Sequence, residues 1–90
     1  MFETQDELEF AMYTYLDRHA KHLPNKMKDL ELTQEQYEQL SISLVKCGFI
    51  ENAQIQTTMN GQEYVTIMNP VMINSRAYNF IRTYEHEHNL

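Results

Sequence analysis

Cysteine, glycine, proline and tryptophan are scarce in this 90-residue sequence, which has one, two, two and none of them respectively. The single cysteine, Cys47, excludes a disulfide within the chain and is typical of a reducing compartment. So few glycines and prolines exclude a collagen-like or low-complexity chain. Because 42% of the residues are apolar and 11% aromatic, we expect one folded domain over residues 1–90.

Long apolar runs are also missing, which excludes a helix that could span a bilayer. The chain opens with Met1-Phe2-Glu3, without the basic and then apolar stretches of a signal peptide. Together with the single cysteine, this pattern predicts a cytoplasmic protein.

Positive charge is sparse and unevenly placed. Seven Lys and Arg stand against thirteen Asp and Glu, for a net charge of −6. Residues 1–17 hold five acids and no Lys or Arg, and residues 47–75 also lack both. A net negative charge opposes non-specific attraction to phosphate, so nucleic acid is not the default partner.

Two threonines mark predicted helix starts. Thr4 and Thr33 are each followed three residues later by Glu or Gln, which is the capping-box pattern. Apolar residues at three-four spacing then predict a helix over residues 5–21 and a second one that ends at Gly48, where a left-handed C-cap is natural. Between them, residues 25–30 are long enough for a short helix.

The apolar period then changes to two. Residues 53–59 and 62–68 alternate around Asn60-Gly61, which is a strong signal for a two-residue hairpin turn. Such a turn predicts these pairs: Met59 with Gln62, Thr57 with Tyr64, Ile55 with Thr66 and Ala53 with Met68. Val65 and Ile67 would then lie on the other side of the ribbon.

A lone hairpin is not stable in water, so it must pack on the helices, and an extended piece at residues 31–32 could add a third strand. Asn74 or Ser75 can cap a last helix. The apolar faces predict a core that includes the following residues: Met12, Leu40, Leu44, Cys47, Phe49 and Ile81.

This order of elements predicts an α+β fold of the winged helix-turn-helix type, with three N-terminal helices, a β-hairpin wing over residues 54–67 and a C-terminal helix. Three segments, residues 32–37, 44–50 and 73–81, carry a resemblance to a known family. In them the chain resembles the YjcQ-like winged-helix proteins of Gram-positive bacteria and their prophages, which usually have Gly where this chain has Ala77. The resemblance implies a small phage or prophage protein in a bacterial or phage-infected cell.

Protein binding is the function that we favour from these residues. Methionine and tyrosine, abundant here, are favoured at protein interfaces, and an acidic surface suits a basic partner on a host or defence protein. The chain would then be a non-enzymatic regulator or inhibitor. The predicted protein-binding residues are Glu35, Glu38, Gln39, Met59, Asn60 and Tyr64.

A DNA-binding transcriptional regulator is the alternative. The predicted reading helix carries Gln34 and Gln39, whose amides can hydrogen-bond base edges. Phosphate contacts would have to come from a cluster earlier in the chain: Arg18, Lys21, Lys26 and Lys28. The sequence leaves the partner's identity and a homodimer open.

The sequence contains no recognisable motif for catalysis or for binding a cofactor. The chain has no Gly-rich phosphate loop and no nucleophile motif. His19 with His22, and His86 with His88, are too few and too widely separated in sequence for a four-ligand zinc pattern. We therefore expect no enzyme activity, no cofactor and no metal site.

Overall fold

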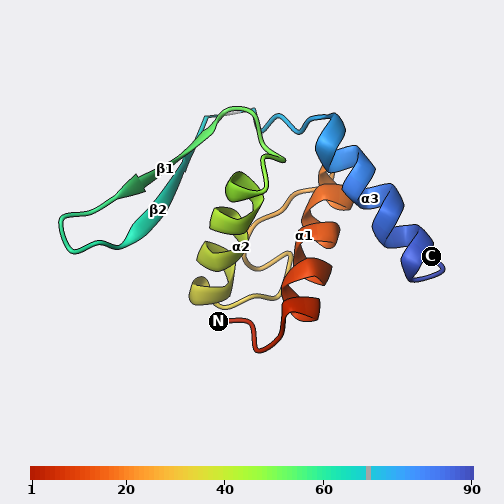
Figure 1. Ribbon diagram of the computed structural model, residues 1–90, viewed down its shortest axis with the longest axis horizontal. Coiled ribbons are helices and arrows are strands. Elements are labelled where there is room, and N and C mark those ends of the chain that lie inside the picture. The colour runs from red at the N-terminus through yellow and green to blue at the C-terminus, as the bar shows by residue number, and fades with distance from the viewer. Residues whose placement is uncertain (69) are drawn as a thin grey trace.

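The computed structural model describes residues 1–68 and 70–90, and it contains three helices and one antiparallel hairpin within them. The elements are α1 (Gln5–Ala20), α2 (Gln34–Lys46), β1 (Ala53–Thr57), β2 (Glu63–Ile67) and α3 (Ser75–Glu87). Helix α1 lies between α2 and α3, and the hairpin extends outward beside α2 (Figure 1). The fold is therefore α+β, with the sheet at one end of a three-helix layer.

Side-chain caps begin all three helices, as the sequence predicts. Thr4 Oγ1 accepts a hydrogen bond from the Glu7 N–H at 3.2 Å, and Asn74 caps α3 in the same way. At α2 both halves of the capping box are present, because Thr33 and Gln36 each accept from the other's backbone N–H. Each cap satisfies N–H groups that have no partner inside the helix.

The predicted short helix over residues 25–30 is wrong. Residues 27–31 form turns, closed by bonds such as Leu30 N–H to Lys26 O at 3.2 Å and Glu31 N–H to Lys28 O at 3.3 Å. Glu31 then takes a left-handed conformation, with φ at 55°, which reverses the chain. So short a segment cannot offset the cost of helix nucleation. Two helices, and not three, precede the hairpin.

The predicted third strand at residues 31–32 is also wrong. Glu31 belongs to the turn and Leu32 to no helix or strand, and the only sheet in the described part of the chain has two strands. A single bridge between Ile50 and Ile73 lies beyond the hairpin and joins its two flanks.

The hairpin is confirmed, but its predicted register is wrong by one residue. Gly61 has φ of 83°, its N–H bonds to Thr58 O at 3.0 Å, and the Thr58 N–H bonds to Gln62 O at 2.8 Å. The loop therefore holds three residues, 59–61, a common hairpin loop in which a left-handed glycine follows a turn. The resulting pairs are Ala53 with Ile67, Gln54 with Thr66, Ile55 with Val65, Gln56 with Tyr64 and Thr57 with Glu63.

This register changes which side chains share a face. A slip of one residue sends every side chain of a strand to the other side. Val65 and Ile67 therefore lie on the same face as Ala53 and Ile55, and these four are half-buried. The observed register gathers the apolar side chains of both strands on one face, whereas the predicted register would have divided them.

The core is formed by all three helices and the segment after α2. Leu16, Leu40 and Leu44 are completely buried, and Met12, Phe49 and Ile81 are nearly so. The predicted burial of Met12, Leu40, Leu44, Phe49 and Ile81 is confirmed. Ala77 is also completely buried.

Cys47 is exposed, so its predicted place in the core is wrong. Helix α2 ends in a Schellman motif, because Phe49 N–H bonds to Leu44 O at 3.1 Å and Gly48 N–H bonds to Val45 O at 3.0 Å. Gly48 adopts the left-handed conformation with φ of 74°. This turn brings Phe49 into the core and leaves the Cys47 thiol outside.

Candidate functional site

A groove between α2 and the hairpin is the first candidate site. We call it the α2–hairpin groove, and its volume is about 460 Å³. Its walls are Tyr37, Glu38, Ser41 and Ile42 from α2, and Thr58, Gln62, Glu63, Tyr64, Val65 and Ile67 from the hairpin. Val65 and Ile67, two positions apart on β2 and so on one face of it, form the apolar wall of the groove, and the observed register places them on the same face as Ala53 and Ile55.

The lining of the α2–hairpin groove is acidic, since it includes Glu38 and Glu63. Lys46 Nζ lies 3.1 Å from Glu63 Oε1 at one edge, so this cation is already paired. Glu38 accepts a hydrogen bond from the Gln34 side-chain amide at 3.2 Å, which does not neutralise its carboxylate. The groove therefore offers apolar surface, a tyrosine and one unneutralised carboxylate.

The structure divides the predicted protein-binding residues among three places. Glu38 and Tyr64 come together in the α2–hairpin groove. Met59 and Asn60 lie at the exposed hairpin tip, where the Met59 side chain is fully exposed. Glu35 and Gln39 are not grouped with either of these two places.

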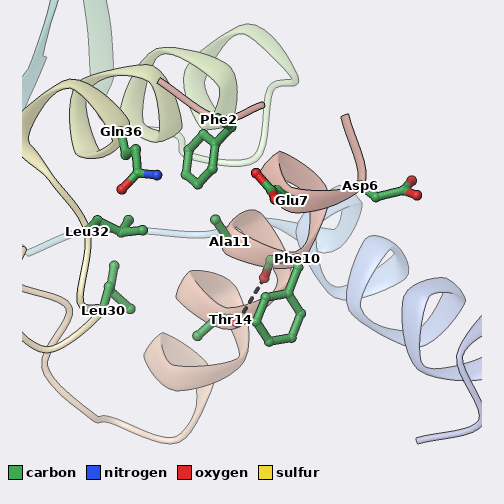
Figure 2. Close-up of a pocket in the computed structure, with 9 residues that line it drawn as sticks. All are labelled: Phe2, Asp6, Glu7, Phe10, Ala11, Thr14, Leu30, Leu32 and Gln36. Carbon is green, nitrogen blue, oxygen red and sulfur yellow. Dashed lines mark hydrogen bonds between the residues drawn. The ribbon is translucent and has the colours of Figure 1, made fainter. Parts of the chain in front are cut away.

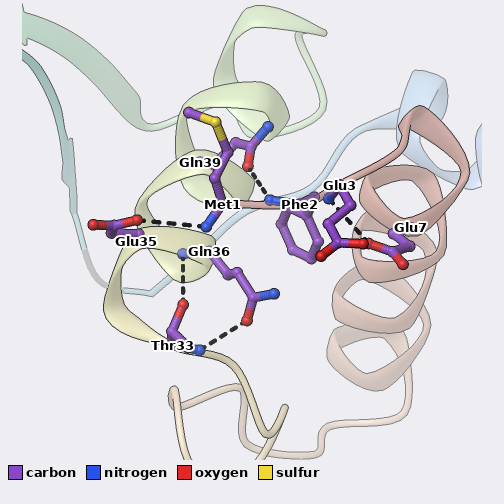
Figure 3. A network of polar contacts seen from close by, with 8 residues as sticks. All are labelled: Met1, Phe2, Glu3, Glu7, Thr33, Glu35, Gln36 and Gln39. Atoms are coloured by element: carbon purple, nitrogen blue, oxygen red, sulfur yellow. Dashed lines mark hydrogen bonds and ion pairs between the residues drawn. The ribbon is translucent and has the colours of Figure 1, made fainter.

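Glu35 and Gln39 hold the first residues of the chain against α2 (Figure 3). The Met1 amine lies 3.5 Å from Glu35 Oε2, and the Phe2 N–H bonds to Gln39 Oε1 at 2.8 Å. The side-chain oxygen of Gln39, Oε1, is therefore already bonded within the chain and is less available to a protein partner or to a base edge.

The predicted nucleic-acid-binding residues are partly engaged as well. The Arg18 guanidinium donates twice to Pro24 O, at 3.1 and 2.8 Å, and Lys21 pairs with Asp17 at 2.9 Å. Lys26 and Lys28 are exposed in the turn before α2. The Gln34 amide is engaged too, because it donates to Glu38. Of the four predicted phosphate-binding residues, Lys26 and Lys28 are the two lysines that have no ion pair among the described residues.

A second groove was not predicted from the sequence. We call it the N-terminal groove, and its volume is about 490 Å³. Its apolar walls are Phe2, Phe10, Ala11, Leu30 and Leu32, and its polar lining is Asp6, Glu7, Thr14 and Gln36 (Figure 2). It lies between the first half of α1 and the chain that leads into α2.

One signal in the sequence could have indicated the N-terminal groove. Phe10 lies off the apolar face of residues 5–21 that carries Leu8, Ala11, Met12 and Tyr15, and it is 56% exposed. A single exposed ring is normal on a protein surface, but this one lies beside Phe2, Leu30 and Leu32 in the groove, and contiguous apolar surface often marks a contact site.

Tyrosines surround the core without forming a reactive site. Tyr13 donates to Glu85 Oε2 at 2.9 Å and stacks on Tyr84 at a ring distance of 4.5 Å, while His88 stacks on the far side of Tyr84. Desolvation, together with the bond to Glu85, raises the pKa of Tyr13 to about 12. Burial likewise raises the pKa of Tyr15 to about 12. These phenols stay neutral near neutral pH, and so none of them is set up as a base.

Among residues 1–68 and 70–90, no three His, Cys, Asp or Glu side chains gather where they could hold a metal ion. No helix in the same part of the chain is long and apolar enough to cross a membrane.

Comparison with known proteins finds no matching family model, no similar curated protein and no similar solved structure. The resemblance to YjcQ-like proteins therefore stays a prediction, and the site must be interpreted from its own residues.

Proposed function

We propose that this protein is a non-enzymatic binding module of winged-helix type that acts as a small regulator or inhibitor by binding a basic segment of another protein. In this arrangement α2 takes the place of the reading helix and residues 54–67 form the wing. The turn over residues 27–31 stands where a winged helix has its second helix.

The α2–hairpin groove is the observation that carries the proposal. Its wall combines apolar side chains such as Ile42 and Val65 with Tyr64 and with the carboxylate of Glu38, and no Lys or Arg lines it. The nearby Lys46 is paired with Glu63. Tyrosine beside apolar surface is typical of interface centres, and acidic groups select a basic partner. In DNA recognition the same helix and wing would have to approach phosphates, which Glu38 would repel.

Engagement of the basic residues also supports a protein partner over DNA. The Arg18 side chain is bonded to Pro24 O and Lys21 is paired with Asp17, so using them for phosphate would break existing contacts. Lys26 and Lys28 alone would supply few of the phosphate contacts that a specific DNA complex makes.

Charge reversal at two positions on α2 tests the proposal. Glu38→Lys changes a residue of the α2–hairpin groove, whereas Glu35→Lys makes the same change three residues earlier, outside that groove. Each variant serves as bait in a lysate of the host cell, and retained proteins are identified by mass spectrometry. We expect a protein that the parent and Glu35→Lys retain and that Glu38→Lys loses.

A mobility shift on random-sequence duplex DNA is run beside the pull-down. We expect no shift by the parent at physiological salt. A salt-sensitive shift by the parent that Glu38→Lys strengthens, with no protein lost from the pull-down, would replace the proposal with the DNA alternative.

A further inference from the structure

The N-terminal groove has an apolar interior whose polar groups are mostly satisfied within the chain. The Thr14 hydroxyl donates to Phe10 O at 2.8 Å, and Gln36 Oε1 accepts from the Thr33 N–H at 2.9 Å. In Figure 2 the side chains of Phe2 and Leu32 point into the hollow. The interior is therefore suited to apolar side chains and not to a polar small molecule, which would need several free hydrogen-bonding groups.

The rim of the N-terminal groove is acidic. Asp6 and Glu7 line the groove and are exposed, and in Figure 2 the Asp6 carboxylate extends away from the hollow. No Lys or Arg occurs in residues 1–17, the Met1 amine is paired with Glu35, and the first Arg of the chain, Arg18, is bonded to Pro24 O. An occupant with positive charge beside its apolar side chains would therefore be complementary to this rim.

A helix is the occupant that the walls can accept. The groove is lined by side chains of α1, of the N-terminal segment and of residues 30–36, and no residue of β1 or β2 contributes to it. Strand addition needs a sheet edge, which this groove lacks, whereas an amphipathic helix lays its apolar side chains into a groove with walls on both sides, here α1 and residues 30–36. A second copy of the chain is disfavoured, since both copies carry a net charge of −6.

We propose that the N-terminal groove is a second docking site that takes a basic amphipathic helix of another protein. Apolar side chains from successive turns of that helix fill the space among Phe2, Phe10 and Leu32, and its flanking Lys or Arg face Asp6 and Glu7. This site is separate from the α2–hairpin groove and does not depend on the function proposed for that groove.

A synthetic helical peptide tests this site without knowledge of the natural partner. The probe has Leu at positions i, i+3, i+4 and i+7, Lys on its other face and a fluorescent label. Binding to the full chain is followed by fluorescence anisotropy. We expect saturable binding of this probe, and no binding of a peptide in which every Lys is replaced by Glu. A scrambled peptide of the same composition, which has no apolar face, should bind at least about tenfold more weakly.

Substitutions on the protein locate the contact. Phe10→Ala removes an exposed ring and should weaken probe binding by about tenfold or more. Tyr78→Ala removes a similarly exposed ring on α3, 46% exposed against 56% for Phe10, and should leave binding unchanged. Circular dichroism of both variants shows that the fold is retained, and Leu32→Ala provides a second test of the apolar wall.

The acidic rim has its own matched pair. Asp6→Asn with Glu7→Gln removes two rim charges and should weaken the probe about threefold or more at low salt. Glu51→Gln with Glu87→Gln makes the same net change outside both grooves and should have little effect.

Three results would overturn this proposal. They are equal binding of the scrambled peptide, binding that Glu38→Lys removes while Phe10→Ala does not, and a concentration-dependent dimer in sedimentation that Phe10→Ala abolishes. The second result would assign the probe to the α2–hairpin groove, and the third would make a second copy the occupant.

Discussion

Leu44 shows at the scale of one residue why this small domain depends on a few side chains. It is completely buried on α2, and its carbonyl also accepts the Phe49 N–H that closes the helix. A chain of this size has one modest core, so a single cavity removes a large share of its stability.

We predict that Leu44→Ala lowers the free energy of unfolding by about 2–5 kcal/mol, through lost burial and the cavity that remains. Urea denaturation followed by circular dichroism measures the change. Leu23→Ala is the matched control, because Leu23 is 45% exposed, and it should cost much less. Equal losses in the two variants would mean that α2 is oriented wrongly.

At the scale of the element, Asn74 joins the start of α3 to the end of α2. Its Oδ1 accepts from the Ala77 N–H at 3.0 Å, and its Nδ2 donates to Gly48 O at 2.6 Å. One side chain thus caps one helix and satisfies a carbonyl in the turn that ends another. The second bond is tertiary and cannot be read from the capping pattern.

We predict that Asn74→Asp costs about 1–2 kcal/mol, even though Asp is as good an N-cap as Asn. The reason is that a carboxylate has no N–H to donate and repels the Gly48 carbonyl. Thr33→Asp is the control, since Thr33 Oγ1 only accepts at its cap. Thermal melts of both variants measure the difference. Equal stability of Asn74→Asp and Thr33→Asp would contradict this prediction.

At the scale of the whole molecule, folding keeps several tyrosines neutral. Burial raises the pKa of Tyr15 to about 12 and raises the pKa values of Tyr37 and Tyr84 above their ordinary value of 10.0, as desolvation does for Tyr13. The folded state therefore holds these protons more tightly than the unfolded state does. Their contribution to stability is complete below pH 10 and is lost as the pH rises toward 12.

We predict that the free energy of unfolding falls as the pH is raised from about 9 to about 11.5, without a matching loss between about 7 and 9. Urea titrations at each pH measure it, and tyrosinate absorbance follows ionisation in the native and the urea-unfolded chain. The prediction would be contradicted if every tyrosine of the native chain ionised at the same pH as in the unfolded chain, at the ordinary phenol pKa.

The two grooves combine residues that one pattern could indicate with residues that only packing could bring together. Glu38 and Tyr64 were both predicted to bind a partner, and they meet in the α2–hairpin groove. Glu35 and Gln39 share α2 with Glu38 but contact the N-terminal segment, Glu35 through the Met1 amine and Gln39 through the Phe2 N–H. The N-terminal groove escaped prediction because Phe2, Phe10 and Leu32 come from three separate segments.

The sequence by itself determined the three long helices with their caps, the left-handed end of α2 at Gly48, the presence of the hairpin and the principal core residues. Those features follow from local signals, such as capping residues, apolar period and glycine, that act over a few neighbouring positions. The loss of helix over residues 25–30 and the exposure of Cys47 have local causes that the apolar pattern did not reveal, namely the cost of nucleating so short a helix and the turn at Gly48. Only the tertiary structure decided the hairpin register and the two grooves, because contacts between segments distant in the sequence determine which side chains share a face and which segments form a wall.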